Sequence, residues 1–167
     1  MNGGYLMAKI KSIITLLVLF VLIFTQTVGA DNTATQNINI TVSTINEISL
    51  STNDVNLTVN APSSGSTLHT VSDSSTTISY STNESNQKIT ATLDKNLPIG
   101  LTLLVEATST SGTSAGQVML EDRAVDVITG LSNVSESGET ITYTLIPDMY
   151  AEPTTESYTI TYTITSS

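Results

Sequence analysis

Large apolar residues alternate with small polar ones along most of the chain, most clearly in its last eleven residues. In the segment 157–167, Tyr158, Ile160, Tyr162 and Ile164 occupy every second position, and threonines fill the positions between them. A period of two places the two sets on opposite faces of an extended strand. Because β-branched and aromatic residues both favour strands, we predict a C-terminal strand whose Tyr and Ile side chains face a core.

A similar run occurs at Glu139–Ile146, where Ile141, Tyr143 and Leu145 share one face. The polar, proline-containing segment 147–153 separates it from the last strand. We expect these two strands to pair with each other at the end of a β domain, after a turn at Ser135–Gly138.

Weaker alternation through the rest of the chain predicts further short strands and no helix after residue 30. They are expected at 37–43, 48–50, 55–59, 68–71, 76–81, 87–93, 101–105, 117–120 and 125–131. Polar residues on the second face of each strand are typical of two sheets that are each dry on one side. The predicted fold is all-β, an Ig-like or pilin-like antiparallel β-sandwich of about 8–10 short strands.

The first thirty residues have the organisation of a signal peptide. Lys9 and Lys11 precede the apolar run Ile13–Phe24, and small residues at Val28–Ala30 suit a cleavage site. The run is shorter than the roughly twenty residues that a spanning helix needs. We therefore expect 1–30 to be removed and 31–167 to form a single β-sandwich domain; the alternative is an uncleaved run that tethers the protein to a membrane.

The residues before Met7 are unusual for the start of a signal peptide. Met7–Lys11 is a more ordinary beginning, and Asn2–Gly4 back-translates readily to a purine-rich run of the kind that bacterial ribosomes bind upstream of a start codon. We infer that Met7 is the true initiator and that the chain is bacterial.

Charge and composition narrow the choice of partners. All fifteen acidic residues follow residue 30, where only Lys88, Lys95 and Arg123 oppose them, so the chain from Asp31 onward carries a formal net charge of −12. Such a surface repels nucleic acid and anionic membranes. The chain has no cysteine, which removes disulfide and thiolate chemistry.

The residues do not suggest a catalytic site, and we predict a protein that is not an enzyme and needs no cofactor. His69 is the only histidine, and Ser66, Ser72 and Asp73 lie near it in sequence. Neighbours along one strand cannot converge in the geometry of a catalytic triad, so His69 is interpreted as a surface residue. No G-x-S-x-G motif and no second histidine support another reading.

Two binding alternatives stay open. Glu121, Asp122 and Asp126 form the densest acidic group, and calcium prefers oxygen ligands, but Arg123 sits among them and a solvated acidic turn is the favoured interpretation. Tyr150, which lies outside any alternating pattern, is the one aromatic candidate for a glycan platform.

The strands themselves supply the remaining functional signal. The N-terminal run that contains Ile38, Ile40 and Val42 is alternating and uncharged, and an edge strand of this kind invites pairing with another chain. The candidate partner is therefore a second copy of the protein; pairing within its own sandwich is the alternative.

The chain resembles small exported bacterial β-sandwich proteins of the spore coat U and fimbrial-subunit type. The resemblance lies in the signal peptide, the alternating segment Ile38–Val42 and the ending Met149–Thr165, where a small, polar loop leads into a Thr-alternating last strand. It implies a non-catalytic structural component of the cell surface, matrix or an appendage, secreted or held at the surface, with the periplasm as a further location. The alternative function is a soluble extracellular binding module for a glycan or for calcium-dependent adhesion.

Overall fold

The computed structural model describes residues 32–167 except 61, 64 and 65. The predicted signal peptide, its cleavage site and the Met7 start therefore lie outside the described residues. The chain divides into two units, Met1–Thr41 and Val42–Ser167. The described part of the first unit, residues 32–41, is exposed and belongs to no strand; the second unit is the β domain.

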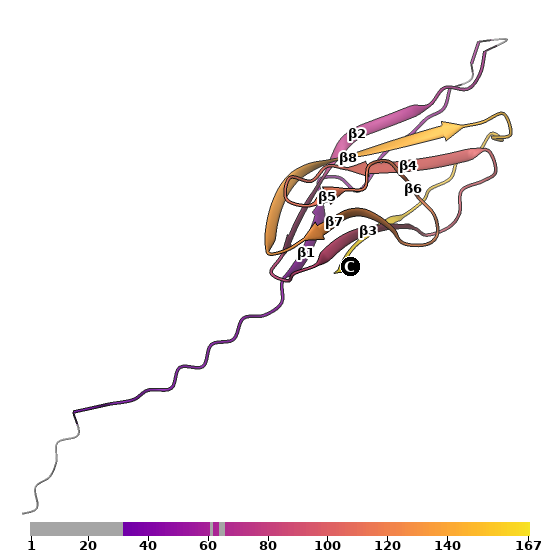
Figure 1. Cartoon of the computed structure of the whole chain (residues 1–167). Coiled ribbons are helices and arrows are strands. Elements are labelled where there is room, and N and C mark those ends of the chain that lie inside the picture. The colour runs from indigo at the N-terminus through magenta and orange to yellow at the C-terminus, as the bar shows by residue number, and fades with distance from the viewer. Residues whose placement is uncertain (1–31, 61, 64–65) are drawn as a thin grey trace, which may run out of the picture. The chain divides into compact units, whose positions relative to one another are not determined.

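The β domain consists of two antiparallel sheets, which confirms the predicted all-β sandwich (Figure 1). The five-stranded sheet has the order β1-β2-β8-β4-β6, and the four-stranded sheet has the order β5-β7-β3-β9. The strands are β1 (Asn46–Leu50), β2 (Val71–Thr82), β3 (Gln87–Leu93), β4 (Leu101–Ala107), β5 (Thr113–Ser114), β6 (Val118–Met119), β7 (Val125–Leu131), β8 (Val134–Pro147) and β9 (Ile160–Ser166).

The core is filled from both sheets by the alternating residues. Ile78, Val105 and Ile141 of the five-stranded sheet are fully buried, as are Ile89 and Ile128 of the four-stranded sheet. Phe and Trp are absent after residue 30, so the core is aliphatic, with Tyr80 and Tyr143 as its buried aromatic members. The period-two pattern therefore predicted the inward faces of the central strands.

The predicted pairing of the two C-terminal strands is wrong. β8 lies in the five-stranded sheet between β2 and β4, whereas β9 lies in the other sheet and pairs with β3. The segment 148–159 between them is long enough to cross from one sheet to the other, and its composition did not distinguish this crossing from a hairpin loop. The two similar sequences therefore lie in different sheets, which a hydrogen bond between Tyr143 and Tyr162 connects.

The predicted turn at Ser135–Gly138 is also wrong. These residues belong to β8, which runs for 14 residues and pairs with β2 through an irregularity where Ile78 lies opposite Glu139 and Tyr80 opposite Glu136. Gly138 adopts φ +75° at this position, a conformation that glycine reaches without steric cost. Here the glycine marks a β-bulge within a strand rather than the end of one.

Three predicted strands are not formed. Residues 37–43 and 55–59 belong to no strand, although Val55 and Leu57 of the second segment pack against the core. Of the segment 68–71, only Val71 lies in a strand, as the first residue of β2. Alternation determines which side chains can share a face, but a strand also needs a neighbouring backbone with which to exchange hydrogen bonds. Sequence periodicity carries no information about that neighbour.

The burial difference within β8 gives a test of the core with a matched control. Ile141 is fully buried and Ile146, on the same strand, is 38% exposed. Ile141→Ala should lower the free energy of unfolding by about 2–5 kcal/mol because it leaves a cavity, and Ile146→Ala should cost under about 1 kcal/mol because it lies near the surface. Denaturant unfolding of both variants measures the difference; equal losses would contradict the assigned core.

Candidate functional site: an open edge between the sheets

One side of the sandwich presents two strand edges next to each other. β1 is the last strand of the five-stranded sheet and β9 is the last strand of the four-stranded sheet, and among the described residues no strand lies beyond either of them. A groove between these edges is lined by Ile48 and Leu50 of β1 and by Ile160 and Tyr162 of β9, together with Ser49, Asn53 and Thr161. Each wall of the groove thus contributes two large side chains, with polar residues beside them.

The predicted phase of the last strand is confirmed at this groove. Ile160, Tyr162 and Ile164 are half-buried and pack against the core, while Thr161 and Thr163 are exposed. Central strands of the sandwich bury their inward side chains completely, as Ile89 does on neighbouring β3. The apolar residues of β9 are therefore only partly covered.

The backbone of β9 offers hydrogen-bonding groups on its free side. Thr159 and Ser167 both bond toward β3 and its flanking residues, through the Asp94 N–H to the Thr159 carbonyl and the Ser167 N–H to the Asn86 carbonyl. Because successive residues of a strand direct their backbone groups to opposite sides, Ile160, Tyr162 and Ile164 direct theirs away from β3. An incoming strand could therefore pair with the same residues whose side chains line the groove.

A tyrosine pair joins the two sheets behind the groove. The hydroxyl groups of Tyr143 on β8 and Tyr162 on β9 lie 2.9 Å apart and share a hydrogen bond. Burial, and then the neighbouring Tyr143, raise the pKa of Tyr162 well above its usual range. Both hydroxyl groups therefore remain protonated, and the bond holds β9 against the other sheet.

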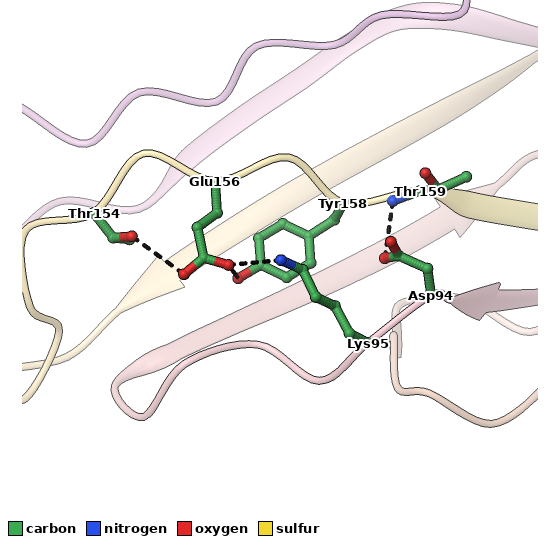
Figure 2. Close-up of polar contacts among 6 residues, drawn as sticks. All are labelled: Asp94, Lys95, Thr154, Glu156, Tyr158 and Thr159. Carbon is green, nitrogen blue, oxygen red and sulfur yellow. Dashed lines mark hydrogen bonds and ion pairs between the residues drawn. The ribbon is translucent and has the colours of Figure 1, made fainter.

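Polar contacts before β9 fix where this strand begins (Figure 2). The Thr159 N–H donates to the Asp94 carboxylate over 3.0 Å. Glu156 accepts a 2.7 Å ion pair from Lys95 and a 3.1 Å hydrogen bond from the Tyr158 hydroxyl, and the Lys95 ammonium lies 4.7 Å from the centre of the Tyr158 ring. These contacts join the incoming segment to the end of β3, so the β9 edge is anchored at its start.

Asn83 determines how the chain enters β1. Its side-chain amide accepts a hydrogen bond from the Ile45 N–H (2.8 Å) and donates one to the Ser43 carbonyl (2.8 Å), and its backbone N–H bonds the Ile45 carbonyl. These bonds continue the β1–β2 ladder beyond the end of β1. Residues 43–45 are consequently held in line with the strand, although Ile45 itself is 44% exposed.

The alternating N-terminal segment leaves its apolar side chains uncovered. Ile38, Ile40 and Val42 are 75%, 83% and 79% exposed, among the highest values for large hydrophobic residues in the described chain. Single exposed apolar residues are common on protein surfaces, but three at every second position would share one face if this segment paired as a strand. The alternating sequence predicts this segment as a strand that can pair with another chain. It does not predict the groove, because the groove depends on β1 and β9 lying side by side in the fold.

The acidic residues proposed for calcium are each engaged elsewhere. Glu121 pairs with Arg123, Asp122 accepts a 2.8 Å bond from Asn96, and Asp126 pairs with Lys88 at 3.0 Å. Within the described chain, no group of three or more acidic, His or Cys side chains is arranged to hold a metal ion. The structure therefore does not bring Glu121, Asp122 and Asp126 together as a ligand set.

The residues near His69 also have separate partners. His69 and Ser66 are exposed, the Ser72 hydroxyl lies 3.1 Å from that of Thr144, and Asp73 accepts bonds from Ser75. These bonds to Ser75 lower the pKa of the Asp73 carboxyl. The contacts organise the start of β2 and give His69 no role in them.

A second exposed apolar group lies on two neighbouring loops. Ile99, Met149 and Tyr150 are 85%, 79% and 76% exposed. The loops touch through their backbones: Gly100 adopts φ +87°, and a Cβ there would lie 2.3 Å from the Ala151 nitrogen. Only glycine permits this approach, so the position of Tyr150, the predicted glycan candidate, depends on Gly100.

No family model matches the chain, and searches of curated proteins and solved structures find no match. Among the described residues there is no helix long and apolar enough to cross a membrane.

A half-buried polar cluster connects β2, β8 and the Ser/Thr-rich loop after β4. The Tyr80 hydroxyl bonds the Glu136 carboxylate and lies 2.8 Å from the Ser109 hydroxyl, which also bonds Glu136. Burial opposes the charged form of Glu136, but hydrogen bonds from Ser111 and Tyr80 outweigh it and lower the pKa of the carboxyl. Glu136 thus connects this loop to β2.

This lowered pKa predicts a pH dependence of stability. A carboxyl whose pKa is lower in the folded chain stabilises it above the unfolded value of 4.5, and this contribution disappears as the pH falls through the folded value. The stability difference between the native chain and Glu136→Gln should be largest near neutral pH and should shrink below about pH 4.5. Denaturant unfolding across this range measures it, with exposed Glu47→Gln as the control for loss of one charge; an unchanged difference at low pH would contradict the assignment.

Proposed function

We propose that the protein is an exported, non-catalytic structural component of the cell surface, matrix or an appendage that assembles by β-strand addition. The observation that carries this proposal is the uncovered apolar face of Ile38, Ile40 and Val42. The free edges of β1 and β9 support it, since a sheet edge is where an added strand can bind.

The free energy of apolar burial can be compared with the free-energy cost of association. Burying three such side chains is worth roughly 5–9 kcal/mol at about 1.5–3 kcal/mol each. Association costs about 4–15 kcal/mol in lost freedom of motion, so apolar burial alone only offsets that cost. The backbone ladder has to contribute the rest, which favours a strand inserted at an edge over a loose hydrophobic contact.

The distribution of charged residues favours contact between two particular segments in the same assembly. The chain from Asp31 onward carries a formal net charge of −12, yet residues 37–43 and 157–167 contain no charged side chain. Copies of the protein therefore repel one another over most of their surfaces, and these two segments can meet without desolvating an ion. The signal-peptide features of residues 1–30 support export.

The assembly proposal is tested by a charge placed on the donor face. Ile40→Asp should abolish polymers, because a carboxylate would have to be buried without a partner. Its melting temperature should equal that of the native chain at a dilution where the native chain is monomeric, because Ile40 is 83% exposed in the single chain. The control is Thr41→Asp, which adds the same charge on the opposite face and should leave polymers intact.

Size-exclusion chromatography with light scattering, and electron microscopy of the full-length preparations, provide the readout. A native chain that runs as a monomer at all concentrations would reject the proposal. So would a large fall in melting temperature for Ile40→Asp relative to the monomeric native chain, because it would show that the segment belongs to its own sandwich.

A second candidate function rests on the exposed loop group of Ile99, Met149 and Tyr150. An exposed tyrosine beside apolar side chains offers a surface on which a sugar ring can stack. This arrangement favours the glycan-binding module as the alternative, with Tyr150 as its platform.

If that alternative holds, Tyr150→Ala should remove glycan binding while Tyr150→Phe retains most of it, because stacking needs the ring and not the hydroxyl. A glycan array followed by titration calorimetry measures this. Absence of binding by the native chain, or equal binding by Tyr150→Ala, would rule out the glycan role.

A further inference from the structure

The sandwich has four terminal strand edges, and they differ in what they offer to an incoming strand. β5 and β6 are two residues each, so either could pair with only a short stretch of another chain. β9 is seven residues long and half-covered along its apolar side. Length alone therefore singles out the side of the sandwich formed by β1 and β9.

We propose that the groove between β1 and β9 is the acceptor site, and that its occupant is the segment Asn37–Ser43 of a second copy of this chain. This inference rests on the proposed function and adds to it the identity of both surfaces. In the bound state Ile38, Ile40 and Val42 lie between the sheets, over Ile48, Leu50, Ile160 and Tyr162, while the donor backbone pairs with β9.

The donor and acceptor match in spacing. Ile38, Ile40 and Val42 occupy every second position over five residues, and Ile160, Tyr162 and Ile164 on β9 do the same. Since paired strands place their side chains in register on each face, three donor residues can each meet a half-covered residue of β9. The backbone groups that β9 directs away from β3 belong to the same three residues, so side-chain burial and the new ladder occur together.

The hydrogen bonds of Asn83 argue that a chain does not fill its own groove. The groove runs beside β1, and residues 43–45 are held in line with β1 by the bonds from Asn83. To reach the groove, the same chain would have to reverse direction between Val42 and Asn46, which would break those bonds. A segment from another copy meets no such restriction.

Directed disulfide cross-linking tests the site, because the native chain has no cysteine. Three single-cysteine variants of the full chain are needed. Thr41→Cys marks the donor on its outward face. Thr163→Cys marks β9 on its exposed face, and Thr113→Cys, also exposed, marks β5 at the opposite edge of the same sheet.

The donor variant is mixed with each size-tagged acceptor variant under mild oxidation, and mixed dimers are counted by mass. A disulfide needs Cα atoms within about 7 Å, so we expect at least about tenfold more mixed dimer with Thr163→Cys than with Thr113→Cys. Thr161→Cys, two residues away on the same face, covers a shift of register.

Ile40→Asp placed in the donor variant should abolish the mixed dimer with Thr163→Cys. The acceptor site would be wrong if polymers form but the donor cysteine cross-links to β5, or to neither position on β9. Assembly by strand addition would still hold in that case. A Thr41→Cys/Thr163→Cys double variant that forms its disulfide within one chain would overturn the second-copy occupant. A native chain that stays monomeric would overturn both the assembly and this site.

Discussion

The backbone groups along a sheet edge need hydrogen-bond partners, and this requirement determines how the sandwich is organised. The central strands β8 and β3 meet it on both sides. At β1 and β9 only one side is paired within the described chain, and the side chains facing the groove between them stay half-buried. The incomplete hydrogen bonding and the incomplete apolar burial thus occur at the same place, which explains why one added strand could resolve both.

Local contacts fix the positions of the two edge strands, β1 and β9. The ion pair between Lys95 and Glu156, with Tyr158 beside it, fixes the start of β9 (Figure 2), and the Tyr143–Tyr162 hydrogen bond holds its middle against the facing sheet. At β1, Asn83 extends the ladder beyond the strand. An exposed ion pair adds little stability by itself. The main effect of these contacts is therefore to fix the position of an edge strand whose apolar side chains are only half-buried.

Much of the fold follows from the sequence, and the exceptions have a common cause. Alternation correctly placed Ile160 and Tyr162 inward and Thr161 and Thr163 outward, because side-chain direction in a strand is a local property. It failed to tell that β8 and β9 lie in different sheets, or that Gly138 is a bulge. Both depend on which backbone lies alongside, and that is decided by long-range pairing. The candidate site shows the same division: the donor-like residues Ile38 to Val42 were visible in the sequence, whereas the groove was not.

The acidity of the chain acquires a specific meaning beside such an edge. A free β-strand edge pairs with any compatible strand, so a protein that carries one risks indiscriminate aggregation. Here like charge opposes close approach over most of the surface, and the β9 residues Ile160–Ser166 are uncharged. Repulsion penalises contacts made anywhere else, while an uncharged alternating strand entering the groove avoids it. In the proposed assembly, negative charge and an uncharged edge would together favour one mode of association. The alternation of apolar residues that builds the core would then also define the strand that this edge accepts.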